Sequence, residues 1–225
     1  PNVVIERWKG INPDTQWRNY WGQTESSPVG TTSSPEAFDQ KRNAIGIPDT
    51  GVAVRVFDVN DREVPVGQVG ELVIRSAAVM KGYWKKQDLT AAALANGWLH
   101  TGDLGYMDED GWFYFVDRKK DMIKTGGENV SSQEVEGTLL QHPKLAMAAV
   151  IGVPDPYWME LVTAIVVPKP DVEVTPEEII AFCKKNMAGY KVPKKVYVRP
   201  ALPMTASGKV LKRELRREFE GKSKT

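Results

Sequence analysis

Five charged residues follow one another at positions 117–121, Asp-Arg-Lys-Lys-Asp, between two apolar segments. Such a run suits an exposed linker better than a core strand, because connecting segments run over the protein surface. The length of 225 residues exceeds that of a usual single domain and suits a small pair. We therefore predict two domains with their boundary in the charged run 117–121.

The segment before the charged run has the pattern of short strands separated by turns. Residues 51–59 alternate valine with other residues, and 71–75 is a short run rich in β-branched residues, so both are predicted strands. An alanine-rich helix is predicted over 88–97, and 112–116 is predicted to be a further strand. This part is expected to be mainly β with one helix.

The segment after the charged run mixes helices and strands. Residues 131–134 have the spacing of a capping box, and Thr175 followed by Pro176 is typical of a helix start. The remaining elements are predicted from apolar or basic runs: strands over 145–153, 162–167 and 196–198, and a basic helix over 210–219. The predicted fold class is α/β, with a β-rich first part and an α/β second part.

Charge and composition exclude some classes of function. Thirty Lys and Arg against 29 Asp and Glu leave a net charge of +1, so no global field marks a nucleic-acid or membrane-surface binder. Hydrophobic residues make up 41% and charged residues 26%, which indicates a soluble protein with a packed core. No apolar run is long enough to span a membrane. One cysteine fits a reducing compartment, so we expect a cytoplasmic protein.

The cysteine and the two histidines are assigned no chemistry. Cys183 shares an apolar helical face with Ile179 and Ile180, which predicts core packing. Neither His100 nor His142 has the neighbours that a zinc or iron–sulfur site requires. His100 is also not accompanied by a serine or cysteine motif, so it is expected to be structural.

The first residues have neither an initial methionine nor the basic region and apolar core of a signal peptide. Residues 3–8 are typical of the tail of a helix whose beginning is absent. Both features lead to the hypothesis that the chain is a fragment.

Five segments match, in order and with suitable spacing, the motifs of one superfamily. They are Tyr20-Trp21-Gly22-Gln23-Thr24-Glu25, Gly70 to Arg75, Trp98 to Asp103, Asp117 to Glu136, and Pro203 to Lys209. On these segments the chain resembles the adenylate-forming superfamily, which includes acyl-CoA synthetases, luciferases and peptide-synthetase adenylation domains. It is most similar to the C-terminal portion of an acyl-CoA synthetase, and the resemblance spans essentially the whole chain.

The resemblance implies a fold, a reaction and a set of ligands. Residues 1–118 would form the last subdomain of the large AMP-binding domain, and 119–225 the small mobile domain that rotates about Lys120. A carboxylic acid, expected to be a fatty acid, and ATP would give acyl-adenylate and pyrophosphate. CoA would then take the acyl group and release AMP. The implied cofactors are ATP/AMP and Mg²⁺, with CoA as co-substrate.

The resemblance also assigns nucleotide-binding residues. It places Tyr20, Trp21 and Gly22 at the nucleotide, with Trp21 against the adenine face, Thr24 on a phosphate oxygen and Glu25 on the magnesium ion. Taken alone, a Gly-x-Thr-Glu segment is more often an exposed turn.

Asp103 and Arg118 are the expected ribose-binding pair. The carboxylate of Asp103 is a natural acceptor for two ribose hydroxyls, and the resemblance makes Arg118 its cationic partner. Taken alone, an aspartate in a Thr-Gly-Asp sequence is usually a turn former.

The two chemical steps are assigned to different segments. Lys209 would be the adenylation lysine, because an ammonium there suits the charge that develops on the carboxylate and α-phosphate. Gly126 and Gly127 would line the CoA channel, where close backbone approach needs glycine, and Lys124 would lie at its mouth. The alternative for the basic residues is a solvated helix face formed by Lys209, Lys212, Arg213, Arg216 and Arg217.

The chain departs from the family pattern in three places. The phosphate-binding loop closed by Pro-Lys-Gly should precede the Gly-x-Thr-Glu segment and is missing, so the isolated chain is expected to be inactive. Residues 30–35 resemble that loop only superficially, because they lie after Glu25 and are followed by Glu36. Ser132 stands where relatives usually have proline, and Met159 where many have glycine.

Three alternatives stay open. The chain could be an adenylation domain that feeds a carrier protein, a non-catalytic interaction fragment, or a nucleic-acid binder with a basic tail, which a steep salt dependence would reveal. Small-molecule substrates are the expected partners, without nucleic acid and without a membrane span. A homodimer and the identity of the acid are left open.

Overall fold

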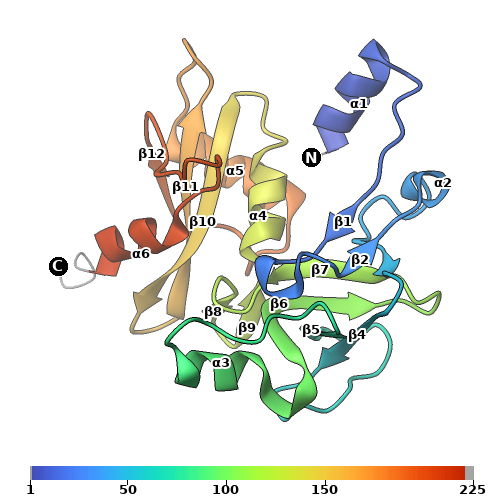
Figure 1. Cartoon of the computed structure of the whole chain (residues 1–225). Helices are drawn as coiled ribbons and strands as arrows, with labels where there is room; N and C mark the ends of the chain where they lie inside the picture. Colours follow the sequence, from blue (N-terminus) through green and yellow to red (C-terminus); the bar gives the residue numbers. More distant parts are fainter. Residues whose placement is uncertain (1, 221–225) are drawn as a thin grey trace. The chain divides into compact units, whose positions relative to one another are not determined.

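A computed structural model describes residues 2–220 of the chain. The chain divides into two compact units, Pro1–Lys119 and Lys120–Thr225 (Figure 1). None of the helices in the described range is both long and apolar enough to cross a membrane.

Unit 1, the residues up to Lys119, contains two sheets. The larger sheet is antiparallel with the order β4-β5-β6-β7, and its strands are β4 (Val52–Phe57), β5 (Gly70–Ser76), β6 (Leu99–Met107) and β7 (Phe113–Arg118). The smaller sheet has the order β1-β2-β3, with β1 (Tyr20–Trp21), β2 (Thr31–Thr32) and β3 (Ile47–Pro48). Trp21 of the small sheet packs in the same core cluster as residues of the large one, among them Leu72, Ile74 and Phe113.

Three helices and two short 3₁₀ turns complete unit 1. They are α1 (Asn2–Ile11), η1 (Thr24–Ser26), α2 (Pro35–Phe38), α3 (Gln87–Ala93) and η2 (Ala95–Gly97). The helix predicted over 88–97 is therefore split at Leu94, whose φ of −112° and ψ of 32° are not helical. Asn96, in the 3₁₀ turn that follows, has a positive φ of 53° that an α-helix does not accept. Residues 30–35, which resemble a phosphate loop, form β2 and the start of α2, with Ser34 as the helix N-cap.

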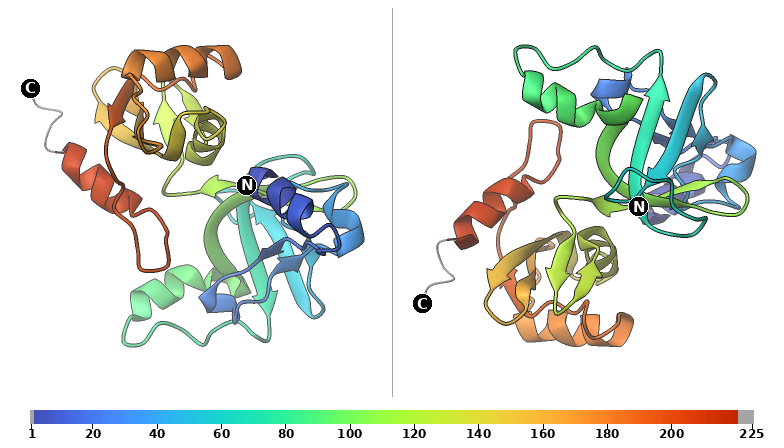
Figure 2. Two further views of the ribbon diagram at one scale, coloured as in Figure 1. Left: turned by 90° about the horizontal axis from the view of Figure 1, so that it is seen from above. Right: turned by 90° about the horizontal axis from the view of Figure 1, so that it is seen from below.

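Unit 2, the residues from Lys120 on, is a five-stranded sheet with helices on both faces (Figure 2). The strand order is β10-β11-β8-β9, and β12 pairs with β11 in parallel. The strands are β8 (Ile123–Thr125), β9 (Glu128–Val130), β10 (Leu145–Asp155), β11 (Met159–Pro168) and β12 (Lys195–Val198). The helices are α4 (Ser132–Leu139), α5 (Pro176–Asn186) and α6 (Lys212–Glu220).

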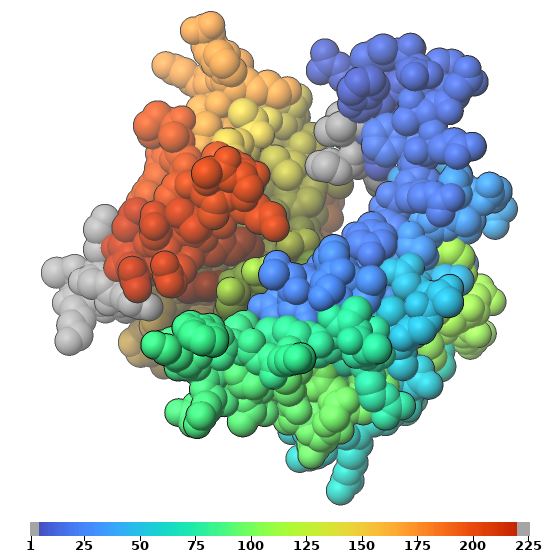
Figure 3. Space-filling model, viewed as in Figure 1, coloured from blue at the N-terminus to red at the C-terminus, as the bar shows by residue number. Residues whose placement is uncertain are grey.

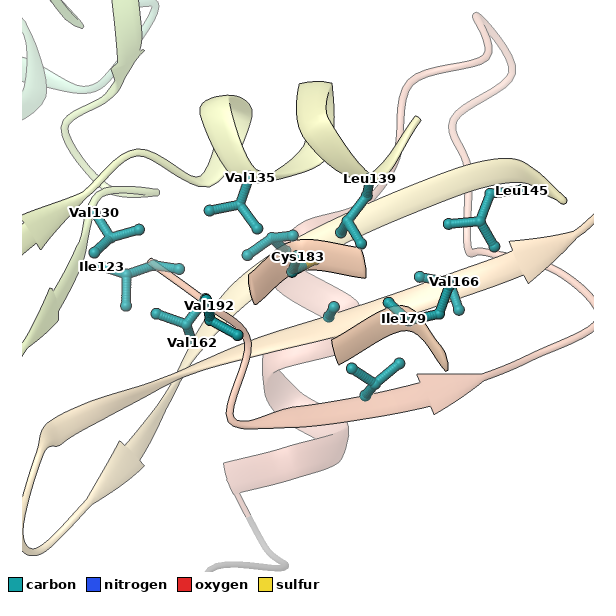
Figure 4. Packing of buried hydrophobic residues seen from close by; sticks show 13 residues of the cluster. Ile123, Val130, Val135, Leu139, Leu145, Val162, Val166, Ile179, Cys183 and Val192 are labelled. Carbon is teal, nitrogen blue, oxygen red and sulfur yellow. The ribbon is translucent and has the colours of Figure 1, made fainter. Parts of the chain in front are cut away.

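Strand β10, at one edge of the sheet, sends alternate side chains to two cores, as the period of a strand requires. Val150 packs with α4 and α5, whereas Ile151 packs against α6. Figure 4 shows the first of these cores, with Ile179 and Cys183 of α5 turned toward the sheet. The predicted core position of Cys183 is confirmed, and burial raises the pKa of its thiol to about 11.

The predicted helix starts in unit 2 are confirmed by their caps. The Ser131 hydroxyl accepts the Glu134 N–H at 3.2 Å, and the Thr175 hydroxyl accepts the Glu178 N–H at 3.2 Å. The predicted start of the last helix at residue 210 is wrong by two residues. Val210 forms a β-bridge with Met204 instead, which commits that segment to a hairpin before α6 begins.

The charged run at 117–121 is not the fully exposed segment that its composition predicts. Asp117 is 1% exposed, because it lies in β7, and its carboxylate accepts the Arg118 N–H at 2.7 Å. Asp121 is 9% exposed and accepts a hydrogen bond from the Arg216 guanidinium at 2.7 Å. Charges of this kind are buried only when they are partnered, and a partner 95 residues away leaves no local signal.

Candidate functional site

The loop that carries Thr24 and Glu25 is closed by a glycine. A Cβ on Gly22 would lie 1.6 Å from the Pro28 carbonyl oxygen, so any other residue at this position would push the loop open. The turn η1 within this loop leaves Thr24 exposed and Glu25 half-buried. Gly22 is thus needed for the shape of the loop, whichever ligand the loop binds.

The carboxylate of Glu25 is oriented by a distant tyrosine. The Tyr83 hydroxyl donates to Glu25 Oε1 at 2.9 Å, and the Met80 N–H donates to the Glu25 carbonyl at 2.8 Å. Burial, followed by the nearby Glu25 carboxylate, raises the pKa of the Tyr83 phenol, which therefore remains a donor at neutral pH. Sequence reasoning missed Tyr83, since 58 residues separate it from Glu25 and only the fold joins them.

Glu25 is the one residue that the sequence analysis assigns to the magnesium ion. Among residues 2–220 there is no group of three or more His, Cys, Asp or Glu side chains that could hold a metal ion. One carboxylate is compatible with Mg²⁺ only where substrate phosphates and water supply the other ligands, which is the usual arrangement for this ion.

Asp103, Trp21 and Arg118 come together from three strands of unit 1. The Trp21 indole N–H donates to Asp103 Oδ2 at 3.0 Å, and Arg118 Nε lies 3.6 Å from Asp103 Oδ1. The side chain of Asp103 is 15% exposed, whereas that of Arg118 is 53% exposed. The expected pair of Asp103 and Arg118 is therefore adjacent, and its carboxylate is held from two sides.

The aromatic residues of the first motif differ in exposure. Trp21 is 9% exposed, so most of its ring lies in the core, and Tyr20 is 56% exposed. Burial and the Asp49 carboxylate raise the pKa of the Tyr20 phenol. The expected contact between Trp21 and an adenine ring stays a prediction, and only the exposed edge of Trp21 is available for it.

The position of Asp103 is set by a register shift in the pairing of β5 and β6 at residues 101–103. From the sequence alone, this Thr-Gly-Asp segment was interpreted as a turn. Gly102 has a positive φ of 72°, and the Thr101 hydroxyl donates to the Leu72 carbonyl at 2.6 Å. The same hydroxyl accepts the Asp103 N–H at 3.1 Å. These contacts make residues 101–103 part of the sheet, which gives Asp103 a defined position.

In unit 2, Gly126 and Gly127 form the tight turn between β8 and β9, with positive φ of 57° and 85°. A Cβ on Gly126 would lie 2.9 Å from the Trp158 ring, whereas a Cβ on Gly127 would meet nothing within 4 Å. Lys124, which precedes the turn, is exposed, and its N–H donates to Glu160 Oε2 at 2.7 Å. Gly126 is thus packed against an aromatic ring, and Gly127 faces open space.

The structure shows what Met159 and Ser132, the two residues that depart from the family pattern, do in this fold. Met159 takes the positive φ of 64° that glycine would accept more easily. Ser132 is fully buried, and its hydroxyl accepts a hydrogen bond from Lys212 Nζ at 2.7 Å. The serine therefore joins α4 to α6, a contact that proline could not make.

Lys209 lies on a short exposed hairpin loop of unit 2. The C-terminal part of the chain that includes this loop is coloured orange-red in Figure 3. The Lys209 N–H donates to the Thr205 hydroxyl at 3.0 Å, and the Lys209 carbonyl accepts the Thr205 N–H at 2.8 Å. Gly208 has the positive φ of 79° that the turn requires. The backbone at Lys209 is therefore well defined while its side chain is exposed.

The basic residues of α6 differ from a uniformly solvated face. Lys212 Nζ lies 2.7 Å from Glu136 Oε1, and Arg216 Nη2 lies 2.7 Å from Asp121 Oδ1. Arg213 and Arg217 are exposed. Because two of the cations hold unit 2 together, the helix offers less free positive charge than its sequence indicates, which weakens the nucleic-acid alternative.

Two family models match the chain. One is described as AMP-binding enzyme and matches residues 1–84, and the other is described as AMP-binding enzyme C-terminal domain and matches residues 134–209.

Curated relatives carry ligase and synthase names. A long-chain-fatty-acid–CoA ligase of Escherichia coli O6:H1 is 43% identical over 220 residues, which cover 98% of this chain and 39% of the relative. A feruloyl-CoA synthase of an Amycolatopsis species is 43% identical over 199 residues, which cover 88% of this chain and 40% of the relative. The chain thus spans about two fifths of the length of these relatives.

Solved structures of similar fold include two that hold nucleotides. The anthranilate CoA ligase AuaEII in complex with anthranoyl-AMP has a TM-score of 0.89 and 30% identity, and the match covers 100% of this chain and 44% of that one. ATP-bound MatB from Rhodopseudomonas palustris has a TM-score of 0.84 and 33% identity, and the match covers 92% of this chain and 41% of that one.

Proposed function

The chain belongs to the AMP-binding enzyme family, and from that premise we propose that it is part of an AMP-forming acyl-CoA ligase. In the first step a carboxylate oxygen attacks the α-phosphorus of ATP, and pyrophosphate leaves. In the second step the CoA sulfur attacks the acyl carbon, the thiol proton is lost, and AMP leaves.

One observation carries this proposal, namely the carboxylate of Asp103 held between the Trp21 indole and the Arg118 guanidinium. A carboxylate oriented in this way is suited to accept hydrogen bonds from two vicinal ribose hydroxyls. Its neighbours fix its orientation before any ligand arrives, which lowers the entropy that binding loses. The arrangement supports a nucleotide site in unit 1.

The class of acid is proposed from the relatives. The long-chain-fatty-acid–CoA ligase and the feruloyl-CoA synthase are each 43% identical to this chain. Their equal identity does not separate a fatty acid from an aromatic acid. We propose a long-chain fatty acid as the first substrate to test and a feruloyl-type acid as the second.

The residues of the two steps are proposed to lie on different segments of unit 2. Lys209, exposed on its defined loop, would stabilise the charge that develops during adenylation. The turn of Gly126 and Gly127 would admit the CoA thiol, with Lys124 at its mouth. Thr24 and Glu25 would face the phosphates. A magnesium ion bound by Glu25 and the nucleotide phosphates would neutralise part of their charge.

Half-reaction assays on the complete protein test this assignment. Lys209→Ala is expected to slow acyl-adenylate formation by roughly 10²–10³, the loss typical of one charge-stabilising donor, and to leave thioester formation from supplied adenylate largely intact. Gly127→Leu is expected to do the reverse, because its side chain enters the space that is open beside Gly127. Lys184→Ala and Gly67→Leu are matched controls, since both positions are exposed and Gly67 shares with Gly127 a positive φ, here 81°, and an open space around its Cβ.

The outcome separates the proposal from its alternatives. If Gly127→Leu transfers the acyl group to CoA normally while Lys209→Ala is still defective in adenylation, a carrier protein becomes the better acceptor. If neither variant differs from its control in either step, the ligase assignment of these residues is wrong.

A further inference from the structure

Glu71 of β5 is a nearly buried carboxylate to which the family resemblance assigns no role. Its side chain is 10% exposed and faces the irregular part of β6. A carboxylate in this position loses hydration, so it stays charged only if several partners replace the lost water. The structure provides them from both of the segments that carry the proposed ribose-binding pair.

The first partner arises from a bulge in β6. Glu71 pairs with Leu104 and Val73 pairs with His100, so the three residues 101–103 lie opposite the single residue Leu72. A bulge of this kind leaves backbone groups without their ladder partners. Here the Gly102 N–H donates to Glu71 Oε1 at 3.0 Å, which satisfies the group next to Asp103.

The second partner comes from the end of β7. Lys119 Nζ donates to Glu71 Oε2 at 3.0 Å, and the Lys119 N–H donates to the Gly102 carbonyl at 2.8 Å. His100 Nδ1 lies 3.5 Å from the same carboxylate oxygen. Lys119 directly follows Arg118, so the two oxygens of Glu71 hold the residues adjacent to Asp103 and to Arg118.

We propose that Glu71 is a positioning residue for the Asp103–Arg118 pair. Glu71 sets the separation of Asp103 and Arg118 through the neighbouring residues Gly102 and Lys119, to which it is hydrogen-bonded. The inference rests on the proposed function, because it takes the ribose as the ligand of the pair. Loss of Glu71 should therefore weaken recognition of the ribose hydroxyls more than it weakens recognition of the rest of the nucleotide.

The test compares the binding of AMP with that of 2′,3′-dideoxy-AMP, which lacks both hydroxyls. We expect Glu71→Ala to weaken AMP binding roughly tenfold and Glu71→Gln roughly threefold, because glutamine keeps an acceptor for Gly102 but loses the charge that faces Lys119. Binding of the dideoxy analogue should change by less than about twofold in both variants. Glu63→Gln is the matched control, since it removes a carboxylate whose side chain is 55% exposed.

Titration calorimetry measures both affinities, and circular dichroism checks that each variant is folded. If Glu71→Ala does not fold, the glutamine variant carries the test. An equal loss of affinity for both ligands, or no loss for either, overturns the positioning role of Glu71. If the unmodified protein itself does not distinguish AMP from the dideoxy analogue, the proposed ribose site is wrong and the inference falls with it.

Discussion

Replacement of Gly22 by alanine tests whether the close approach of two backbone segments shapes the Thr24–Glu25 loop. The alanine Cβ would lie 1.6 Å from the Pro28 carbonyl oxygen, and contacts under 3.0 Å essentially never occur. The carbonyl must therefore retreat by at least 1.4 Å, the difference between the two values. The atom in the way belongs to the backbone, so no side-chain rotation relieves the clash.

The magnitude follows from what this movement breaks. Besides the Tyr83–Glu25 hydrogen bond, two contacts tie the loop to its surroundings: the Ser27 hydroxyl donates to the Ala78 carbonyl at 2.7 Å, and the Met80 N–H donates to the Glu25 carbonyl at 2.8 Å. Neither remains a hydrogen bond if it lengthens by a comparable amount. Overpacking of about 1–3 kcal/mol and two lost bonds of about 1 kcal/mol each give an expected loss of about 3–5 kcal/mol in the free energy of unfolding.

Urea unfolding measures the free energy, and adenylate formation measures the consequence for the loop. Gly10→Ala is the matched control, because no atom lies within 4 Å of its new Cβ and alanine favours the surrounding helix. We expect this control to be neutral or slightly stabilising. An unchanged urea midpoint and unchanged adenylation in Gly22→Ala would refute the argument that backbone contact requires glycine there.

Three further predictions concern unit 2. Lys120→Pro should slow one half-reaction far more than the other, because proline fixes φ near −65° and removes a backbone donor at the proposed hinge; equal slowing in the two assays would contradict the hinge. Lys212→Met should lower the free energy of unfolding by about 1–3 kcal/mol, because it removes the ammonium group that lies 2.7 Å from Glu136 Oε1. Arg213→Met, at an exposed position, should change it by less than about 0.5 kcal/mol, and similar urea midpoints for the two variants would argue against a stabilising Lys212 pair. The pKa of about 11 for Cys183 predicts that at pH 8 only about one thiol in 10³ is ionised, so iodoacetamide should label the protein in urea but not under native conditions, where rapid labelling would show an accessible thiolate.

Much of the secondary structure could be predicted from local patterns. The β-branched run at 71–75 became β5, and the N-cap at Thr175 starts α5, because alternation and capping are properties of a few consecutive residues. Strand β6 (Leu99–Met107) was not predicted at all. Its Thr-Gly-Asp sequence is typical of a turn, and the bulge there depends on Glu71 across the sheet. The same limit applies to Asp117, whose burial depends on its position in β7.

The sequence by itself determined the family motifs, their order and the local start signals of the helices. Only the tertiary structure decided that Trp21 and Asp103, 82 residues apart, share a hydrogen bond, and that Tyr83 orients Glu25. The physical reason is that such contacts depend on strand register, on a bulge and on packing between distant segments. No window of consecutive residues contains that information, whereas periodicity and capping are complete within one turn of helix or one strand.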